Sequence, residues 1–208
     1  MQVFSAADVP PGAVVRPATS AEIWGAQFGD EYTRTNQCRW TDRIVLWKSL
    51  LQATGARSVA EYGCNAGWNL SAIRRLYPDV LTWGVDVNLR ACQQAWTSGF
   101  ADSVFHSDSL DAIPAPVELA FTAGVLIHVE DELLEGTMRA LITKSWRWVV
   151  AIEYEADETE QGRSAERKAL VWRRPYGKLY QALGLRQFDV GPAGPGFPDC
   201  TCWVFEKP

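Results

Sequence analysis

The sequence predicts an α/β fold: a mostly parallel sheet with helices on both faces. Two observations support this prediction. Short β-like runs alternate with helix-like runs from residue 56 onward, which is typical of parallel strands joined by crossover helices. The last two of the seven β-like runs, 185–191 and 201–207, have no helix between them. The final strand is therefore predicted to be antiparallel.

The N-terminal part, residues 1–55, is predicted to form a lead-in and a helical lid over one compact domain, residues 56–208. Residues 1–20 are rich in Pro, Ala and Gly. A helix is expected over 20–29, with Ser20 as its N-cap. The apolar spacing of 41–55 predicts a second helix that begins at Thr41 and ends at Gly55.

The remaining strands and helices are expected to follow one another along the domain. The helix over 165–184 contains Pro175, which should break or kink it. The expected strands are 57–63, 80–87, 102–108, 117–127, 146–155, 185–191 and 201–207, and the expected helices are 66–78, 88–99, 130–144 and 165–184.

Composition narrows the classes of partner. The net charge is −5, whereas binding to nucleic acid needs a clustered basic face. The one basic cluster, 166–178, is interpreted as a helix with one solvated face, with a small-anion site as the alternative. No apolar run reaches membrane-spanning length and no signal peptide is recognisable, which predicts a cytoplasmic protein without a membrane partner. Five scattered cysteines indicate neither a disulfide framework nor a metal site.

The stretch SVAEYGCNAGWNL, residues 58–70, has the strand–turn–helix order that places a ligand at the carboxyl end of a strand. Gly63 and Gly67 allow close approach of the backbone, and Asn65 tolerates a left-handed conformation. The spacing differs from the GxGxxG of dinucleotide sites. Glu61, just before the turn, would repel a pyrophosphate and suits a cationic ligand. A dehydrogenase is therefore disfavoured.

Two further acids end the next two predicted strands. Asp86 is placed to accept hydrogen bonds from both hydroxyls of a ribose, and Asp108 from an adenine amino group. The alternative interpretation of each acid taken alone is a residue of a surface loop. Three acids at three successive strand ends, together with the glycine turn, are a considerably stronger signal of a ligand site than any one of them.

The motifs VAEYGCNAG, GVDVN and HSDSL resemble the successive cofactor motifs of class I S-adenosylmethionine-dependent methyltransferases. Within that superfamily the chain is most similar to the pseudaminic acid biosynthesis-associated methylases, through a GxNxGxNL turn (63–70), GVLIHV (124–129) and EYT (31–33). The resemblance implies a Rossmann-like methyltransferase sheet and S-adenosylmethionine as cofactor. It fades in the acceptor half, where LVWRRPYG (170–177) and DCTC (199–202) depart from the family pattern, so the acceptor is not inherited.

The predicted cofactor site combines this resemblance with the predicted lid. In the lid, Arg34 is expected to grip the methionine carboxylate, with a solvated helix charge as the alternative. The turn should surround the methionine part, Asp86 the ribose, and Asp108 the adenine. The predicted cofactor-binding residues are Tyr32, Arg34, Glu61, Gly63, Cys64, Asn65, Gly67, Asn69, Asp86, Val87, Asn88, Asp108, Ser109, Leu110, Ala123, Gly124 and Val125.

Four residues are candidates for catalysis. His128 follows the fourth strand and has the chemistry of a general base, or it packs against the cofactor. Glu153 and Tyr154 end the fifth strand, where they would orient an acceptor or form a rim ion pair. Tyr176 is predicted to place its ring against the sulfonium, with a packed helix aromatic as the alternative.

The leading functional hypothesis is a methyltransferase that modifies an oxygen or nitrogen of a small polar molecule. Its alternative is an enzyme of the same fold that cyclises S-adenosylmethionine to azetidine-2-carboxylate and methylthioadenosine, using Glu61, Tyr176 and Asn65. A third is a non-catalytic binder of the cofactor. The expected partner is a small-molecule substrate, with neither nucleic acid nor metal, and the sequence leaves the oligomeric state open.

Overall fold

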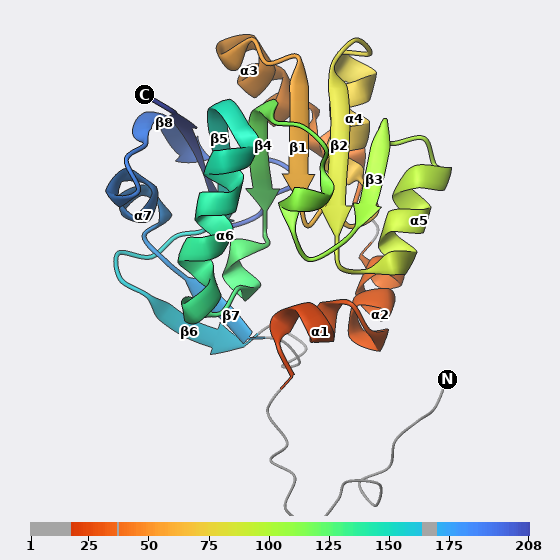
Figure 1. Cartoon of the computed structure of the whole chain (residues 1–208), viewed down its shortest axis with the longest axis horizontal. Helices are drawn as coiled ribbons and strands as arrows, with labels where there is room; N and C mark the ends of the chain where they lie inside the picture. Colours follow the sequence, from red (N-terminus) through yellow and green to blue (C-terminus); the bar gives the residue numbers. More distant parts are fainter. Residues whose placement is uncertain (1–17, 37, 164–169) are drawn as a thin grey trace, which may run out of the picture.

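The computed structural model describes residues 18–36, 38–163 and 170–208. Its main sheet has seven strands in the order β3-β2-β1-β4-β5-β9-β8 (Figure 1). All neighbouring strands are parallel except β9, which runs antiparallel to β5 and β8. This confirms the predicted fold class and the antiparallel last strand. The strands are β1 (Ser58–Tyr62), β2 (Leu81–Asp86), β3 (Ser103–His106), β4 (Val117–Ala123), β5 (Ser145–Tyr154), β8 (Arg186–Pro192) and β9 (Cys200–Glu206).

Two hydrophobic clusters cover the two faces of the sheet, because successive side chains of a buried strand point to opposite sides. On one face Trp47 and Ile73 pack against β1, β4 and β5. On the other face Met138 and Tyr180 pack against the alternate residues of the same strands. The helices of the domain are α3 (Ile44–Thr54), α4 (Trp68–Leu76), α5 (Leu89–Thr97), α6 (Asp131–Lys144) and α7 (Tyr176–Ala182), with short 3₁₀ turns η2 (Trp40–Arg43), η3 (Leu110–Ala112) and η4 (Leu126–His128).

Two short helices, α1 (Ser20–Trp24) and α2 (Gln27–Thr35), lie below the carboxyl ends of the strands (Figure 1). Thr19, not Ser20, caps α1, through a reciprocal pair of hydrogen bonds with Glu22. Within the predicted N-terminal segment and helical lid, residues 1–55, we use the name lid for α1 and α2. Helix α3 belongs to the domain core, because its apolar face (Trp47, Leu50 and Leu51) is buried against the sheet. Residues 1–17 of that segment lie outside the described part of the chain.

The predicted helix over 165–184 is wrong in its first half. Its described part before Pro175 is a strand, β7 (Leu170–Arg173), which pairs with β6 (Glu160–Arg163) in a separate two-stranded sheet. The helix, α7, begins only at Tyr176. Val171 and Trp172 favour a strand, and the buried ring of Trp172 anchors it. The basic cluster therefore does not form one solvated helix, and its residues 166–169 are outside the described ones.

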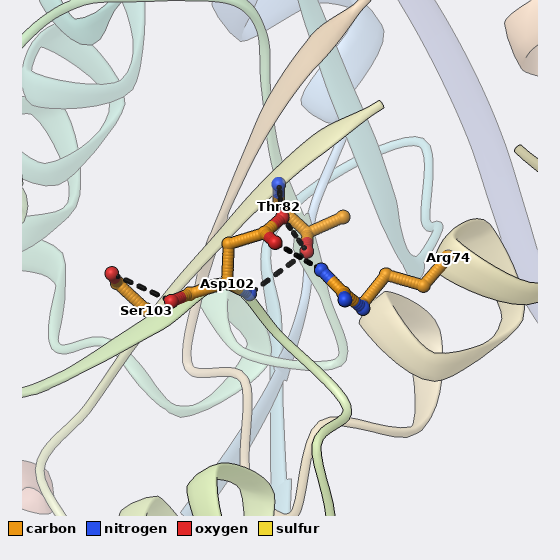
Figure 2. Close-up of polar contacts among 4 residues, drawn as sticks. All are labelled: Arg74, Thr82, Asp102 and Ser103. Carbon is orange, nitrogen blue, oxygen red and sulfur yellow. Dashed lines mark hydrogen bonds and ion pairs between the residues drawn. The ribbon is translucent and has the colours of Figure 1, made fainter. Parts of the chain in front are cut away.

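A polar cluster at the opposite end of the sheet ties β2, β3 and α4 together. The carboxylate of Asp102 accepts hydrogen bonds from the backbone N–H (2.8 Å) and the hydroxyl (2.9 Å) of Thr82 and is ion-paired with Arg74. The Ser103 hydroxyl donates to the Asp102 carbonyl (Figure 2). Although burial raises the pKa of Asp102, the bonds from Arg74 and Thr82 hold it below its usual value.

We expect Asp102→Asn to lower the free energy of unfolding by about 1–2 kcal/mol, since the ion pair and one of the carboxylate's acceptor positions are lost. Because the pKa of Asp102 is lowered in the folded protein, its contribution in the wild type is full above about pH 4 and is lost on further acidification. Urea titrations at about pH 7 and pH 3 measure both effects. Ser103→Ala is the control in the same cluster, and identical unfolding curves for Asp102→Asn and the wild type would contradict the prediction.

None of the described helices is both long and apolar enough to cross a membrane.

Candidate functional site

A cavity of about 530 Å³ lies at the carboxyl ends of the strands, between them and the lid helices α1 and α2. Sixteen predicted site residues line it, so the structure brings together motifs that are far apart in sequence. They are Tyr32, Glu61, Gly63, Cys64, Asn65, Asn69, Asp86, Val87, Asn88, Asp108, Ser109, Leu110, Ala123, Gly124, Val125 and His128.

Two predicted cofactor residues do not line this cavity. Arg34 is on α2, with its side chain 60% exposed and paired to Glu31 at 2.6 Å. Gly67 is the N-cap of α4 with a φ of +80°. A Cβ at Gly67 would lie 3.1 Å from Cβ of Ala95, so this glycine serves the turn and the packing of α4 on α5.

The turn after β1 depends on its own glycine and asparagine. Gly63 has a φ of +74° and Asn65 a φ of +45°, both in the left-handed region. A Cβ at Gly63 would lie 2.4 Å from a methyl carbon of Val125, so only glycine fits there. The backbone N–H of Gly63 and that of Cys64 donate to the Val85 carbonyl at 2.8 and 3.0 Å, which folds the turn back over the sheet.

Glu61 is a buried carboxyl at the floor of this cavity, with 2% of its surface exposed. One oxygen accepts a 2.5 Å hydrogen bond from the Asn69 amide. The other oxygen is buried and has no hydrogen-bond partner among the described residues. Burial raises the pKa of Glu61 to about 8, against the opposing effects of Asn69 and Arg43. At neutral pH the carboxyl is therefore mostly protonated.

Arg43 is a site residue that the sequence did not reveal. Its guanidinium donates to Oδ1 of Asn69 at 2.7 Å, and the Trp47 indole donates to the same oxygen at 3.1 Å. Asn69 therefore links Arg43 to Glu61. Arg43 ends the 3₁₀ turn η2, and no motif surrounds it in the sequence that would have distinguished it from other basic residues.

Four residues that line the cavity carry a buried polar atom without a hydrogen-bond partner within the described chain. Oε2 of Glu61 is an acceptor once the carboxyl is ionised, and the donors are Nε of Arg43 and the indole N–H groups of Trp24 and Trp68. Buried polar groups are normally hydrogen-bonded. One acceptor and three donors are the complement of a ligand that carries both an ammonium and a carboxylate.

Asp86 ends β2 and fixes two loops. One carboxylate oxygen accepts from the backbone N–H of Asn65 at 2.7 Å, and the other from that of Asn88 at 2.8 Å. Burial raises its pKa, and these N–H groups partly offset the effect. Asn88 also donates to the Trp24 carbonyl (3.1 Å) and to Asp30 (3.0 Å), so the loop after β2 holds the lid in place.

A second cavity, of about 590 Å³, adjoins the first at Ala123, Gly124 and His128, which line both. The His128 ring packs against Trp24 of the lid, with centroids 4.7 Å apart. Tyr154 lines this second cavity. The hairpin β6–β7, which the sequence did not predict, supplies another part of its wall through residues 160–162, 171 and 173.

Two buried ionisable side chains, Glu153 and Arg174, form hydrogen bonds with the backbone of the loop between β4 and α6. Glu153 lines neither cavity, and its carboxylate accepts 3.2 Å hydrogen bonds from the backbone N–H groups of Val125 and Leu126. Burial raises its pKa to about 7, with those N–H groups opposing. Arg174 donates to the carbonyls of Leu126 (2.8 Å) and Val129 (2.9 Å). Glu153 is therefore placed to position the loop and not to contact an acceptor.

Tyr176 is not at the site. Its side chain is 0% exposed in the core on the α6–α7 face of the sheet. The ring packs edge-on against Trp203, with centroids 5.8 Å apart. Tyr176 is absent from the walls of both cavities, because α7 begins there and turns the ring toward β9. The alternative reading of a packed helix aromatic is the one that the structure supports.

Comparisons with known proteins define the fold. No protein-family model and no curated protein sequence matches the chain. Among solved structures, magnesium protoporphyrin IX methyltransferase from Synechocystis PCC 6803 with bound SAM is similar at a TM-score of 0.69 and 12% identity, over 94% of this chain and 100% of that one.

Two further structures are similar over nearly the whole chain. A Burkholderia thailandensis 1,6-didemethyltoxoflavin-N1-methyltransferase, with its substrate and S-adenosylhomocysteine bound, has a TM-score of 0.68, 15% identity and 93% coverage of both chains. A sugar N-methyltransferase from Streptoalloteichus sp ATCC 53650 has a TM-score of 0.64 and 13% identity, over 100% of this chain and 98% of that one. At such identities the similarity establishes a shared fold.

Proposed function

We propose that this chain is an S-adenosylmethionine-dependent methyltransferase that modifies an oxygen or nitrogen of a small polar molecule. The observation that carries the proposal is the pair of adjoining cavities: the first offers unsatisfied partners for an amino-acid end, and the second has room for an acceptor. The fold shared with methyltransferases that contain SAM or S-adenosylhomocysteine supports it. The proposal stops at the superfamily, since the narrower resemblance to pseudaminic acid-associated methylases rests on motifs of the cofactor half.

The residues of the first cavity fit the cofactor. Glu61 would receive its ammonium, and Arg43, not the predicted Arg34, would receive its carboxylate. The indole N–H groups of Trp24 and Trp68 are further donors. Asp86, whose two oxygens keep lone pairs free beside their backbone hydrogen bonds, would accept from the ribose. Asp108, also on the cavity wall, would accept from the adenine.

When bound, the cofactor would supply an electrophilic methyl group for a lone pair of the acceptor, with the thioether as the leaving group. The chain's own contribution is mainly alignment. His128 lines both cavities where they meet, and its ring packs against Trp24 of α1. His128 is the candidate for receiving the proton that an acceptor O–H or N–H releases. Glu153 and Arg174 hold the loop that carries it.

The deciding experiment incubates the purified chain with SAM bearing a deuterated methyl group, alone and with a panel of small amines, phenols and hydroxy acids. Mass spectrometry follows S-adenosylhomocysteine, methylthioadenosine and labelled products against a no-enzyme control. We expect bound, unconsumed cofactor without an acceptor, and labelled product plus S-adenosylhomocysteine with one. Enzyme-dependent methylthioadenosine and azetidine-2-carboxylate from SAM alone would instead establish cyclisation and overturn the proposal.

A further inference from the structure

We infer that the second cavity selects a flat acceptor that carries a carboxylate, and that Arg173 is the group that binds this carboxylate. The inference rests on the proposed function, because it names the substrate class of the same site. Arg173 belongs to the basic cluster, 166–178. The described part of that cluster before Pro175 forms strand β7, where the sequence predicted a helix.

Arg173 ends β7 and lines the second cavity. Its guanidinium carbon lies 5.3 Å from the ring centroid of Tyr154, which lines the same cavity. A stacked guanidinium keeps the N–H groups of its edge available. Within the described chain Arg173 makes no side-chain hydrogen bond or ion pair, including none with Glu160, its neighbour across the hairpin. The fork that best recognises a carboxylate therefore has unused donors.

The charges around this cavity favour an anion. Arg43, at the wall shared with the first cavity, is a second guanidinium and lies 4.6 Å from the centroid of Phe197. Glu160 is the one acidic residue among the described residues that line the second cavity, and both it and Arg173, its partner in the strand register, are exposed. Since the proposed function assigns Arg43 to the cofactor's carboxylate, Arg173 is the guanidinium left for the acceptor, and it would repel an ammonium and attract a carboxylate.

The shape of the wall favours a flat molecule. Trp24, Phe28 and Tyr32 of the lid line this cavity, and their rings form one edge-packed group with centroids 4.8–4.9 Å apart. Rigid aromatic walls suit a planar ring, whose face stacks and whose edge carries the polar groups. The nucleophile of such an acceptor would lie toward Gly124 and His128, where the two cavities meet.

The test uses the full chain saturated with S-adenosylhomocysteine and three matched pairs of probes: salicylate, 4-hydroxybenzoate and anthranilate, each against its primary amide. Calorimetry measures affinity, and product analysis with SAM measures turnover. We expect at least one acid to bind ten-fold or more tightly than its amide. Arg173→Met should remove that advantage while leaving the affinity for S-adenosylhomocysteine unchanged. Arg90→Met, an exposed arginine on α5 away from both cavities, is the matched control.

The inference is overturned if no acid binds more tightly than its amide, or if Arg173→Met and Arg90→Met behave alike. Its failure is distinguishable from that of the proposed function. Methylation of the amides, or of a neutral amine or phenol, would refute the inference that the acceptor carries a carboxylate. It would still agree with the proposal that the chain is a methyltransferase. Production of methylthioadenosine from SAM alone would refute the methyltransferase itself.

Discussion

Glu61→Gln is expected to weaken SAM binding about 10- to 100-fold and to abolish the proton release that accompanies it. In the ligand-free protein the buried carboxyl has a pKa of about 8, so most molecules carry its proton at pH 7. An ammonium beside Oε2, the oxygen that lacks a partner among the described residues, favours the ionised form. Binding should therefore expel close to one proton. The affinity loss corresponds to a hydrogen bond between charged groups, about 1.5–3 kcal/mol.

Calorimetry at pH 7 in buffers of different ionisation enthalpy counts the released proton. The comparison between wild type and Glu61→Gln isolates the contribution of this carboxyl, because the glutamine keeps the shape and the contact with Asn69. Asp79→Asn, on an exposed loop position, is the control for removing an acidic side chain. Equal proton release by the wild type and Glu61→Gln would show that Glu61 does not meet the ammonium.

The same carboxyl makes folding depend on pH, and Glu153 adds to the effect. Both pKa values are raised on folding, to about 8 and about 7 from an ordinary value of 4.5. Between those limits the folded state keeps protons that the unfolded chain releases. The free energy of unfolding should therefore fall as the pH rises from about 5 to 8, by at most about 1.4 kcal/mol per pH unit for each group. Glu61→Gln should flatten this slope, and urea titrations across the range measure it.

Much of the first cavity was predictable because its residues are local in sequence. Glu61, Gly63 and Asn65 lie in one turn, and the requirement for a left-handed backbone restricts the residue types that can occupy it. Asp86 and Asp108 follow β2 and β3, and parallel strands bring their carboxyl ends to one edge. Their position at the site follows from the alternation of strands and helices alone.

The second cavity depends on contacts that the sequence does not encode locally. Residues 165–184 have helical propensity in Ala, Glu, Arg, Lys and Leu, yet β7 forms because residues 170–173 pair with 160–163 and bury Trp172. Arg43 reaches the site only because Asn69 and Phe197 hold it there. Arg34, nine residues earlier, follows the EYT motif, but its side chain is exposed, pairs with Glu31 and lines neither cavity. Strand pairing determines the structure of β7, and contacts between residues distant in sequence determine the position of Arg43.

Arg174→Met is expected to lower the free energy of unfolding by about 2–5 kcal/mol, which for a chain of this size is a fall in Tm of roughly 5–15 °C. The side chain is 1% exposed, and it bridges two backbone carbonyls and Asp131. Methionine fills much of the volume but leaves the carbonyls of Leu126 and Val129 without their donor. Buried acceptors without a partner carry the full cost of desolvation.

Arg174 is also expected to affect ligand binding and turnover, which an ordinary core residue would not. The carbonyls that it holds flank η4, the turn that carries His128 at the junction of the two cavities. Loosening η4 should weaken the binding of S-adenosylhomocysteine and lower turnover even at a temperature where the variant stays folded. Arg139→Met on α6 removes only an exposed pair with Glu135 and should change stability by less than about 0.5 kcal/mol. If Arg174→Met lowered Tm and left affinity and turnover intact, Arg174 would stabilise the fold without positioning the site.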